Sequence, residues 1–520
     1  MKKVIVLGIM LSVSLLGFTQ NEFKPEQTVA YPFKITSKNI NPSHTLVLVT
    51  DNKQVAMMDA VTCKVKWSIG LNDKFKIEKA EWCGFSTEND SVWIVYKEKN
   101  ERKTLTLNPQ TGEKVAGPVV EKPNADEKSK SGEKGKLLDI KHNYPFNENG
   151  VTVRINYKMK LMANVFSSSD YALTVLCDGK YKWSQTVNAK VMPALISPSS
   201  KKLADFLTAY VQGDKLFIVY DGFSVLDLVS GKILWTSGFD YVNADLGLTK
   251  LTQQYPKAPF PYCDGKVVYV TDMHDNARKL KALDAGTGKM IWESEKYDKD
   301  AMVSNMYFVN NTIINQFGGR IFTLISKVSS NSETYISDYA FPTDGGFKSY
   351  DATSGKLLWT TFDKAEYSGL KKRTTNSIVK DNIIYVATEK ELFAIDALTG
   401  KLKHSTPLSK FDIGVPKELS FLNDNLFLYS TEGFAMLTTD GKVVYNTPTK
   451  EIFTYDVMGK IYVVWIGDDI YNLNSFLCFD PLTGKIAGKM KDTAYPYFSE
   501  SGDAFIKFDG NKEMLRFKIY

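Results

Sequence analysis

Short apolar runs separated by polar turns recur along almost the whole chain. Typical runs are KLFIVY at 215–220, KVVYV at 266–270, NIIYVA at 382–387, NLFLYS at 425–430 and KIYVVW at 460–465. They are rich in β-branched and aromatic residues and follow turn pairs such as Gly213-Asp214 and Asp381-Asn382. This pattern predicts short strands joined in antiparallel hairpins.

One phrase closes most of these hairpin units. Clear copies are DLVSGKILW at 227–235, DAGTGKMIW at 284–292, DATSGKLLW at 351–359, DALTGKLK at 396–403 and DPLTGKI at 480–486. Weaker copies are DAVTCKVKW at 59–67, with Cys63 in place of Gly, NPQTGEK at 108–114, DGKYKW at 178–183 and DGKVVY at 440–445. The Asp and the Thr or Ser cap a tight turn with side-chain oxygens, and Gly supplies a positive φ. Each unit is therefore predicted to hold four short antiparallel strands.

The repetition predicts an all-β fold, a single closed β-propeller of four-stranded antiparallel blades. A blade cannot bury both of its faces until neighbouring blades stack on it. The C-terminus adds a tenth, partial unit of three strands, AYPYF, DAFIKF and EMLRFKIY. We expect TVAYPFKI at 28–35 to supply its fourth strand, so that the N-terminal strand closes the last blade.

The phrase Ala-x-Asp-x-x-Thr-Gly-Lys-x-x-Trp, complete in KALDAGTGKMIW, resembles the blade repeat of the pyrroloquinoline-quinone (PQQ)-type propeller family. That family includes quinoprotein alcohol dehydrogenases and BamB-like outer-membrane assembly factors. The resemblance covers nearly the whole chain from residue 20. It implies that the closing tryptophans dock on the turn of the adjacent blade, namely Trp67, Trp183, Trp235, Trp292 and Trp359. It also implies eight blades, against ten units counted, so 8–10 blades stay open, with irregular stretches at 121–205 and 320–345 as candidate embellishments.

The first residues predict export. Lys2 and Lys3 precede an apolar run from Val4 to Leu16, followed by a small-residue cleavage site, so residues 1–19 are interpreted as a signal peptide. The run is too short for a comfortable membrane span. No Cys follows it closely, so we expect a soluble periplasmic or extracellular protein that is not a lipoprotein, with residues 20–520 forming the PQQ-like propeller domain.

The net charge of +6 is small for this length, and acidic and basic residues are interspersed. Nothing in this distribution indicates nucleic acid or an anionic membrane as a partner. The segment 121–136 (EKPNADEKSKSGEKGK) has no large apolar residue and is interpreted as a flexible charged loop. Apolar residues spaced as i, i+3, i+4 and i+7 in 200–210 suit one short amphipathic helix, although its last residues could equally begin a strand.

Five cysteines leave at least one thiol unpaired in an exported protein. Cys177 and Cys478 are expected to be buried free thiols, and Cys63 with Cys83 is the one pair worth testing for a bridge, whereas the state of Cys263 is open. No two cysteines are adjacent. The quinoprotein dehydrogenases that the chain resembles carry a vicinal disulfide under the quinone, which this chain cannot form.

No catalytic constellation is evident. The histidines His44, His142, His274 and His404 fit no metal-binding spacing. Asp272, His274, Asp275 and Asn276 cluster in DMHDN, but Asp and Asn also serve turns for backbone reasons, so we interpret this cluster as a polar loop rather than a cation site. The sequence therefore predicts no catalytic residue, no metal site and no cofactor.

Three functions remain open at this stage. The favoured one is an exported, non-catalytic scaffold that binds a protein or glycan partner in the cell envelope, by analogy of fold. The alternatives are a PQQ- and calcium-dependent dehydrogenase, or a propeller hydrolase or lyase with acid and base contributed from several blades.

Overall fold

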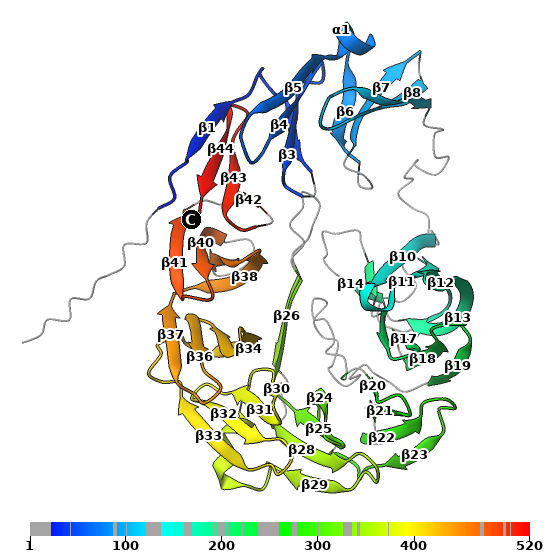
Figure 1. Cartoon of the computed structure of the whole chain (residues 1–520), viewed down its shortest axis with the longest axis vertical. Helices are drawn as coiled ribbons and strands as arrows, with labels where there is room; N and C mark the ends of the chain where they lie inside the picture. The colour runs from blue at the N-terminus through cyan, green and yellow to red at the C-terminus, as the bar shows by residue number, and fades with distance from the viewer. Residues whose placement is uncertain are drawn as a thin grey trace, which may run out of the picture. The chain divides into compact units, whose positions relative to one another are not determined.

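The computed structural model describes residues 22–519, except 42, 87–90, 100, 121–136, 161–168, 192, 196–202, 206, 221, 238–258, 260, 273–277, 299–300, 326–334, 341–343, 373, 468–472, 492–495 and 500 (Figure 1). The predicted signal peptide, residues 1–19, and the predicted charged loop, residues 121–136, lie outside the described residues.

The chain forms two compact units. Unit 1 takes its described residues from Met1–Lys122 and Glu451–Tyr520, and unit 2 takes them from Pro123–Lys327 and Ser332–Lys450. Unit 1 therefore combines the two ends of the chain.

Unit 1 contains four four-stranded antiparallel sheets. In the order of their hydrogen-bonded neighbours they are β2 (Ser37–Ile40), β3 (Leu46–Thr50), β4 (Gln54–Asp59) and β5 (Val65–Gly70); β6 (Ala80–Phe85), β7 (Val92–Glu98), β8 (Glu101–Leu107) and β9 (Lys114–Val120); β38 (Ile452–Met458), β39 (Ile461–Gly467), β40 (Leu473–Asp480) and β41 (Lys485–Met490); and β42 (Tyr497–Phe498), β43 (Ala504–Asp509), β44 (Glu513–Lys518) and β1 (Gln27–Ala30). A single helical turn, α1 (Leu71–Phe75), follows β5.

Unit 2 contains six such sheets, and consecutive sheets follow the chain. They are β10 (Leu137–Phe146), β11 (Val151–Lys160), β12 (Ser169–Gly179) and β13 (Trp183–Val191); β16 (Thr208–Gln212), β17 (Lys215–Tyr220), β18 (Gly222–Asp227) and β19 (Ile233–Ser237); β20 (Tyr262–Cys263), β21 (Val267–Asp272), β22 (Lys279–Asp284) and β23 (Met290–Glu293); β24 (Val303–Val309), β25 (Thr312–Phe317), β28 (Gly346–Asp351) and β29 (Leu357–Thr360); β30 (Ile378–Lys380), β31 (Ile383–Ala387), β32 (Glu391–Asp396) and β33 (Leu402–Pro407); and β34 (Pro416–Leu422), β35 (Asn425–Ser430), β36 (Gly433–Leu437) and β37 (Val443–Pro448). Two further hairpins pair β14 (Pro193–Leu195) with β15 (Leu203–Asp205) and β26 (Arg320–Ile325) with β27 (Tyr335–Ala340), and the 3-10 turns are η1 (Asn147–Asn149) and η2 (Ala365–Lys371).

These sheets confirm the predicted all-β fold class of four-stranded antiparallel blades. The described residues hold ten four-stranded sheets, as the repeat count predicts and above the eight of the resemblance. Of the suspected embellishments, 320–345 holds the hairpin β26–β27, whereas 121–205 holds the full sheet of β10 to β13 as well as the hairpin β14–β15. The helix considered for 200–210 is wrong, because residues 203–205 form β15, and the alternative is confirmed, because the last residues of the stretch begin β16. The apolar segment there is too short to nucleate a helix.

The core lies between neighbouring sheets. The two middle strands of most sheets are buried on both faces, as in β17, where every residue from Leu216 to Tyr220 has at most 6% of its surface exposed. Phe217 and Val225 pack with Val268 and Ala282 of the next sheet. Continuous apolar runs are the signature of strands covered on both faces. The sequence runs such as KLFIVY therefore encode the stacking of sheets as well as the strands.

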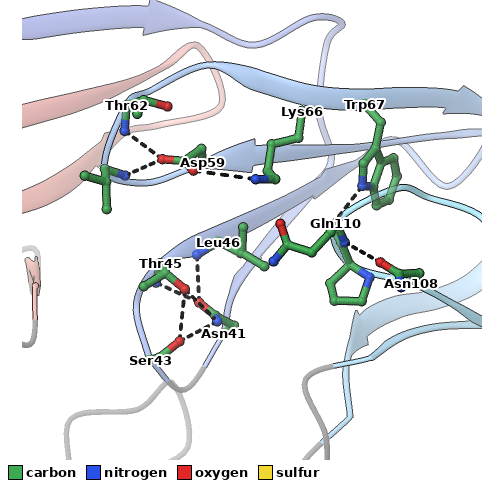
Figure 2. A network of polar contacts seen from close by, with 12 residues as sticks. Asn41, Ser43, Thr45, Leu46, Asp59, Thr62, Lys66, Trp67, Asn108 and Gln110 are labelled. Atoms are coloured by element: carbon green, nitrogen blue, oxygen red, sulfur yellow. Dashed lines mark hydrogen bonds and ion pairs between the residues drawn. The ribbon is translucent and has the colours of Figure 1, made fainter.

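The recurring Asp turn is built as the sequence predicts. In the first copy, Oδ1 of Asp59 accepts the N–H groups of Val61 and Thr62, at 2.9 and 2.7 Å (Figure 2). The turn before it, between β2 and β3, is held by Asn41, whose Oδ1 accepts the N–H groups of Thr45 and Leu46, both at 2.8 Å. Side-chain oxygens thus replace the missing backbone partners of both turns.

The closing tryptophans dock on the next turn, which confirms the predicted role. Each indole N–H donates to a carbonyl oxygen there; the pairs are Trp67 to Pro109, Trp183 to Leu228, Trp235 to Ala285, Trp292 to Ala352 and Trp359 to Ala397, at 2.9 to 3.1 Å. The ring covers the glycine of that turn: a Cβ on Gly355 would lie 2.5 Å from Cε3 of Trp292. Gly355 also has a φ of +70°, so two separate constraints require glycine.

In the last strand of eight of the ten described sheets, a β-bulge precedes the position that the docking tryptophan occupies in the clear copies. In β23, Met290 pairs with Leu283 and Trp292 with Ala282, so Ile291 has no partner across the ladder. A bulge bends a strand and re-aims the side chain that follows it. Here it turns the docking residue toward the next sheet.

The N-terminal strand completes the last sheet of the chain, as predicted. β1 pairs antiparallel with β44, from Gln27 opposite Arg516 to Ala30 opposite Glu513. The strand is shorter than the 28–35 expected from the sequence. Ile35, which follows it, is buried against the first sheet with 2% of its surface exposed.

Candidate functional site

One sheet carries an insertion that its blade does not need. β25 and β28 pair directly, from Thr312 opposite Asp351 to Phe317 opposite Gly346, yet residues 318–345 intervene between them. The corresponding strands β31 and β32 are joined by residues 388–390 alone, and β35 and β36 by residues 431–432. We call residues 318–345 the ribbon, because they hold the hairpin β26–β27.

Glycines bring both legs of the ribbon close to the connection between β29 and β30. A Cβ on Gly319 would lie 2.8 Å from Oγ1 of Thr374 and 2.9 Å from Nε2 of Gln316. On the other leg, a Cβ on Gly345 would collide with the carbonyl oxygen of Leu370. Both legs of the ribbon are therefore packed against this connection.

A buried amide network fixes the same base. Gln316 has 1% of its surface exposed. Its Oε1 accepts from Nδ2 of Asn305 at 2.9 Å, and from the backbone N–H and the hydroxyl of Ser377 at 3.0 and 2.7 Å. Its Nε2 donates to the carbonyl oxygen of Thr375 at 3.1 Å. Removing one partner of such a buried network leaves the others unsatisfied, at about 1–3 kcal/mol for each group.

Tyr307 extends the network. Its hydroxyl donates to the carbonyl oxygen of Ser377 at 2.6 Å. Burial raises the pKa of Tyr307 to about 12, so the phenol stays neutral and remains a donor at physiological pH. The base of the ribbon is therefore held by neutral hydrogen bonds, which salt screens little.

The ribbon itself is a regular antiparallel pair. The register runs from Arg320 opposite Ala340 to Ile325 opposite Tyr335, and the sequences RIFTLI and YISDYA have the β-branched and aromatic content that favours strands. β26 lies against β34, the first strand of a later sheet in the same unit (Figure 1). Among the described strands β27 pairs with β26 alone, so its second edge can receive another strand.

The family model described as outer membrane protein assembly factor BamB matches residues 177–331 and 223–489, which together span more than half of the chain. The chain belongs to this BamB-like family of PQQ-type repeat proteins.

Three solved structures align with this BamB-like chain over long stretches. BamB from Moraxella catarrhalis is 12% identical, with 78% of this chain and 94% of that chain covered and a TM-score of 0.24. The computationally designed Ika8 protein is 13% identical, with 60% and 96% covered and a TM-score of 0.26. The quinohemoprotein alcohol dehydrogenase ADHIIG from Pseudomonas putida HK5 is 9% identical, with 70% and 72% covered and a TM-score of 0.33. No curated protein matches the BamB-like chain in sequence.

The DMHDN cluster is only partly described. Asp272 lies at the end of β21 with 3% of its surface exposed, and its Oδ2 is 2.6 Å from Nζ of Lys281 on the neighbouring strand. His274, Asp275 and Asn276 lie outside the described residues. In this BamB-like chain the one described carboxylate of the cluster is engaged by a lysine.

The described histidines serve separate structural contacts. Nδ1 of His44 is 2.9 Å from the carbonyl oxygen of Phe498, and His142 stacks on Tyr144 and Tyr157. His404 stands at the position of the docking tryptophan, and its Nε2 is 3.0 Å from the carbonyl oxygen of Thr439. The structure brings none of these three together with another histidine in the interactions it describes.

All five cysteines are free and buried. This confirms the expectation for Cys177 and Cys478, and the structure shows no bridge between Cys63 and Cys83. Burial raises the pKa of the Cys83 thiol to about 11, which keeps it protonated and unreactive.

No three His, Cys, Asp or Glu side chains within the described part of the chain gather where they could hold a metal ion. None of the described helices is long and apolar enough to cross a membrane.

Sequence reasoning missed the network at the base of the ribbon. β25 reads TIINQF, whereas the equivalent strands read KLFIVY, NLFLYS and KIYVVW. A consecutive Asn315 and Gln316 inside an otherwise apolar strand was the available signal, since buried amides require dedicated partners.

Proposed function

We propose that this protein is an exported, non-catalytic scaffold of the cell envelope that binds a protein partner through the ribbon. The observation that carries the proposal is the fixed base of an insertion that adds no strand to its own sheet. The strands of a blade are needed to pack against the neighbouring sheets, whereas residues 318–345 add no strand to their own sheet.

A binding role fits the physical character of the ribbon. Long insertions without a role in the sheet are unusual in compact proteins and commonly carry binding sites on a rigid scaffold. The Gln316 network and the close approach of Gly319 and Gly345 hold the base, so less conformational entropy is lost when the ribbon binds. The unpaired edge of β27 can accept an extended segment of a partner as an additional strand.

Membership of the BamB-like family supports a protein as the partner, since the family description names an outer-membrane assembly factor. The predicted signal peptide, residues 1–19, supports export, and the absence of adjacent cysteines disfavours the dehydrogenase alternative. We therefore expect the partner to be a protein of outer-membrane assembly.

The test removes the ribbon without disturbing its sheet. Gly318 and Gly319 have φ values of +62° and +83°, and Phe317 pairs with Gly346. Deleting residues 320–345 leaves Gly318-Gly319 as a two-residue hairpin loop with positive φ at both positions, as a type I′ turn requires. The matched control shortens the other inserted hairpin of unit 2, β14–β15, by deleting residues 195–203, which leaves Ala194 and Ala204 as a two-residue loop between the paired Pro193 and Asp205.

Each variant is cross-linked in its native envelope, and the captured protein is purified and titrated against all three forms. We expect the ribbon deletion to keep its melting temperature and lose binding, while the control binds like the intact protein. Equal binding by the folded ribbon deletion would refute the proposal. Binding of a purified glycan instead of a protein would show that the partner is a glycan and would overturn this part of the proposal.

A further inference from the structure

The copy of the repeat that begins at Asp480 has no side chain at the docking position. In three of the clear copies a tryptophan stands eight residues after the Asp of the turn, as Trp292 follows Asp284, and in the copy at Asp396 this position is His404. In the copy that begins at Asp480 this position is Gly488, on β41. Its ladder has the usual bulge, and Gly488 pairs with Cys478 as Trp292 pairs with Ala282. The frame of the docking site is therefore present, but β41 supplies no side chain for it.

The ring of Phe23 fills this place. An ideal Cβ on Gly488 would lie 2.7 Å from Cε1 and Cζ of Phe23, the kind of approach that Trp292 makes to Gly355. The Phe23 ring packs edge-on against Phe505 of the next sheet, with centroids 5.2 Å apart. Phe23 also joins the cluster of Phe476, Phe505 and Phe517, which spans the two sheets. The ring of Phe23 thus lies between one sheet and the next sheet, as the docking tryptophans do.

The backbone around Phe23 is tied to β41. Glu22 forms a parallel bridge with Lys489, and the N–H of Phe23 donates to the carbonyl oxygen of Lys489 at 3.1 Å. Three residues later the chain changes sheets. The N–H of Glu26 donates to the carbonyl oxygen of Arg516 at 2.7 Å, its carboxylate pairs with the Arg516 guanidinium, and β1 begins at Gln27.

We propose that the surface over Gly488 is a docking site for an aromatic side chain delivered by a separate extended segment, and that residues 22–26 of the same chain occupy it with Phe23. The segment then acts as a strap. Glu22 and Phe23 cover the edge of β41, and β1 covers the edge of β44. Residues 22–30 therefore join the last two sheets of the chain.

The backbone at Gly488 can accept a side chain, so the source of the aromatic ring can be moved from the strap to β41. No positive φ is found at Gly488, so a side chain there is not excluded by backbone strain. A tryptophan at 488 would restore the ordinary repeat, but only if the ring of Phe23 is absent. Addition of the side chain on β41 and its removal from the strap are therefore expected to compensate each other.

The experiment compares Phe23→Ala, Gly488→Trp and the double variant in the full-length protein after removal of the predicted signal peptide. Phe23→Ala should raise the unfolding equilibrium constant of the C-terminal sheets about tenfold or more, because a packed aromatic ring is lost. Gly488→Trp alone should also destabilise, since two rings would compete for one volume. The double variant should recover most of the stability of the unmodified protein. Additive losses in the double variant would overturn the proposal.

A second readout follows the strap itself and does not depend on global unfolding. Glu26 is exposed, and limited digestion with a glutamate-specific protease, which can cut the Glu26-Gln27 bond, reports how firmly the strap is held. Cleavage after Glu26 should be faster in Phe23→Ala, and it should stay fast in the double variant even though stability returns. Equal cleavage of the unmodified protein and Phe23→Ala would show that Phe23 does not hold the strap.

Discussion

The docking of Trp292 on the next turn should contribute a measurable part of the free energy of unfolding. Its indole donates to Ala352 at 2.9 Å, covers Gly355 and lies 6.0 Å from the ring of Tyr269. Burying an aromatic side chain removes roughly 150–250 Å² from water. At about 25 cal/mol per Å², that area corresponds to roughly 4–6 kcal/mol for full burial, and partial burial together with the Cβ that alanine keeps reduces the transfer contribution to about 2–3 kcal/mol. The hydrogen bond adds about 1 kcal/mol. Trp292→Ala should therefore lower the free energy of unfolding by roughly 3–4 kcal/mol.

Trp359 and Trp93 provide the comparison. Trp359 makes the same contact but has only 8% of its surface exposed, so Trp359→Ala should cost about 3–5 kcal/mol. Trp93 has 38% of its surface exposed and follows no Asp turn, so Trp93→Ala should cost less than either.

Denaturant unfolding is followed by circular dichroism, with the transition that includes unit 2 analysed separately because a chain of two units need not unfold in one step. A change for Trp292→Ala within about 0.5 kcal/mol, the usual range for surface sites, would refute the docking energy. A loss of stability that is largest for Trp359→Ala, intermediate for Trp292→Ala and smallest for Trp93→Ala would support it, whatever the absolute values.

Three further predictions follow from particular residues. Deleting residues 20–30 removes β1 and leaves the edge of β44 unpaired, so the protein should associate on sizing chromatography, and an unchanged monomer with an unchanged melting temperature would contradict the role of β1. Titration with pyrroloquinoline quinone and calcium should not raise the melting temperature or give dye reduction with alcohols or sugars; tight binding at about a hundredfold excess over Kd would add about 2.7 kcal/mol and would favour the dehydrogenase alternative. Hydrogen bonds from Thr287 and Ser354 lower the pKa of Asp284 and Asp351 below 3.8, so their contribution to stability is present above that value and is lost as the pH falls through the lowered pKa; the unfolding free energy should decline below about pH 4, and the double variant Asp284→Asn, Asp351→Asn should decline less.

The fold could be predicted because the same few local interactions recur in most copies of the repeat. An Asp that accepts backbone N–H groups, a Gly with positive φ and a Trp at fixed spacing are individually weak signals, but their joint recurrence leaves few architectures. Even the copy with Cys63 in place of Gly adopts a positive φ of 56°, so the surrounding repeat overrides the preference of one residue. The supply of a fourth strand by the N-terminus followed from counting strands.

The candidate site could not be predicted in the same way. The partners of Gln316 come from Asn305 on the preceding strand and from Thr375 and Ser377 beyond the ribbon, so no local pattern contains the network. The role of the position at Gly488 could not be predicted either, because the ring that fills it comes from Phe23, far away in the sequence. Periodicity describes what a segment does by itself, and both features depend on segments that meet only after folding.

The docking contacts also set an order of folding. Each tryptophan reaches a carbonyl oxygen between 38 and 60 residues further along the chain, so these contacts can form as soon as one more sheet has been completed. The pair between Glu26 and Arg516 spans 490 residues and requires the whole chain. Contacts between distant residues form slowly, because the entropy of closing the loop is lost before they contribute. We therefore expect β1 to reach its place after the docking contacts have formed, so that the rate at which β1 joins β44 sets the time at which the last sheet is complete.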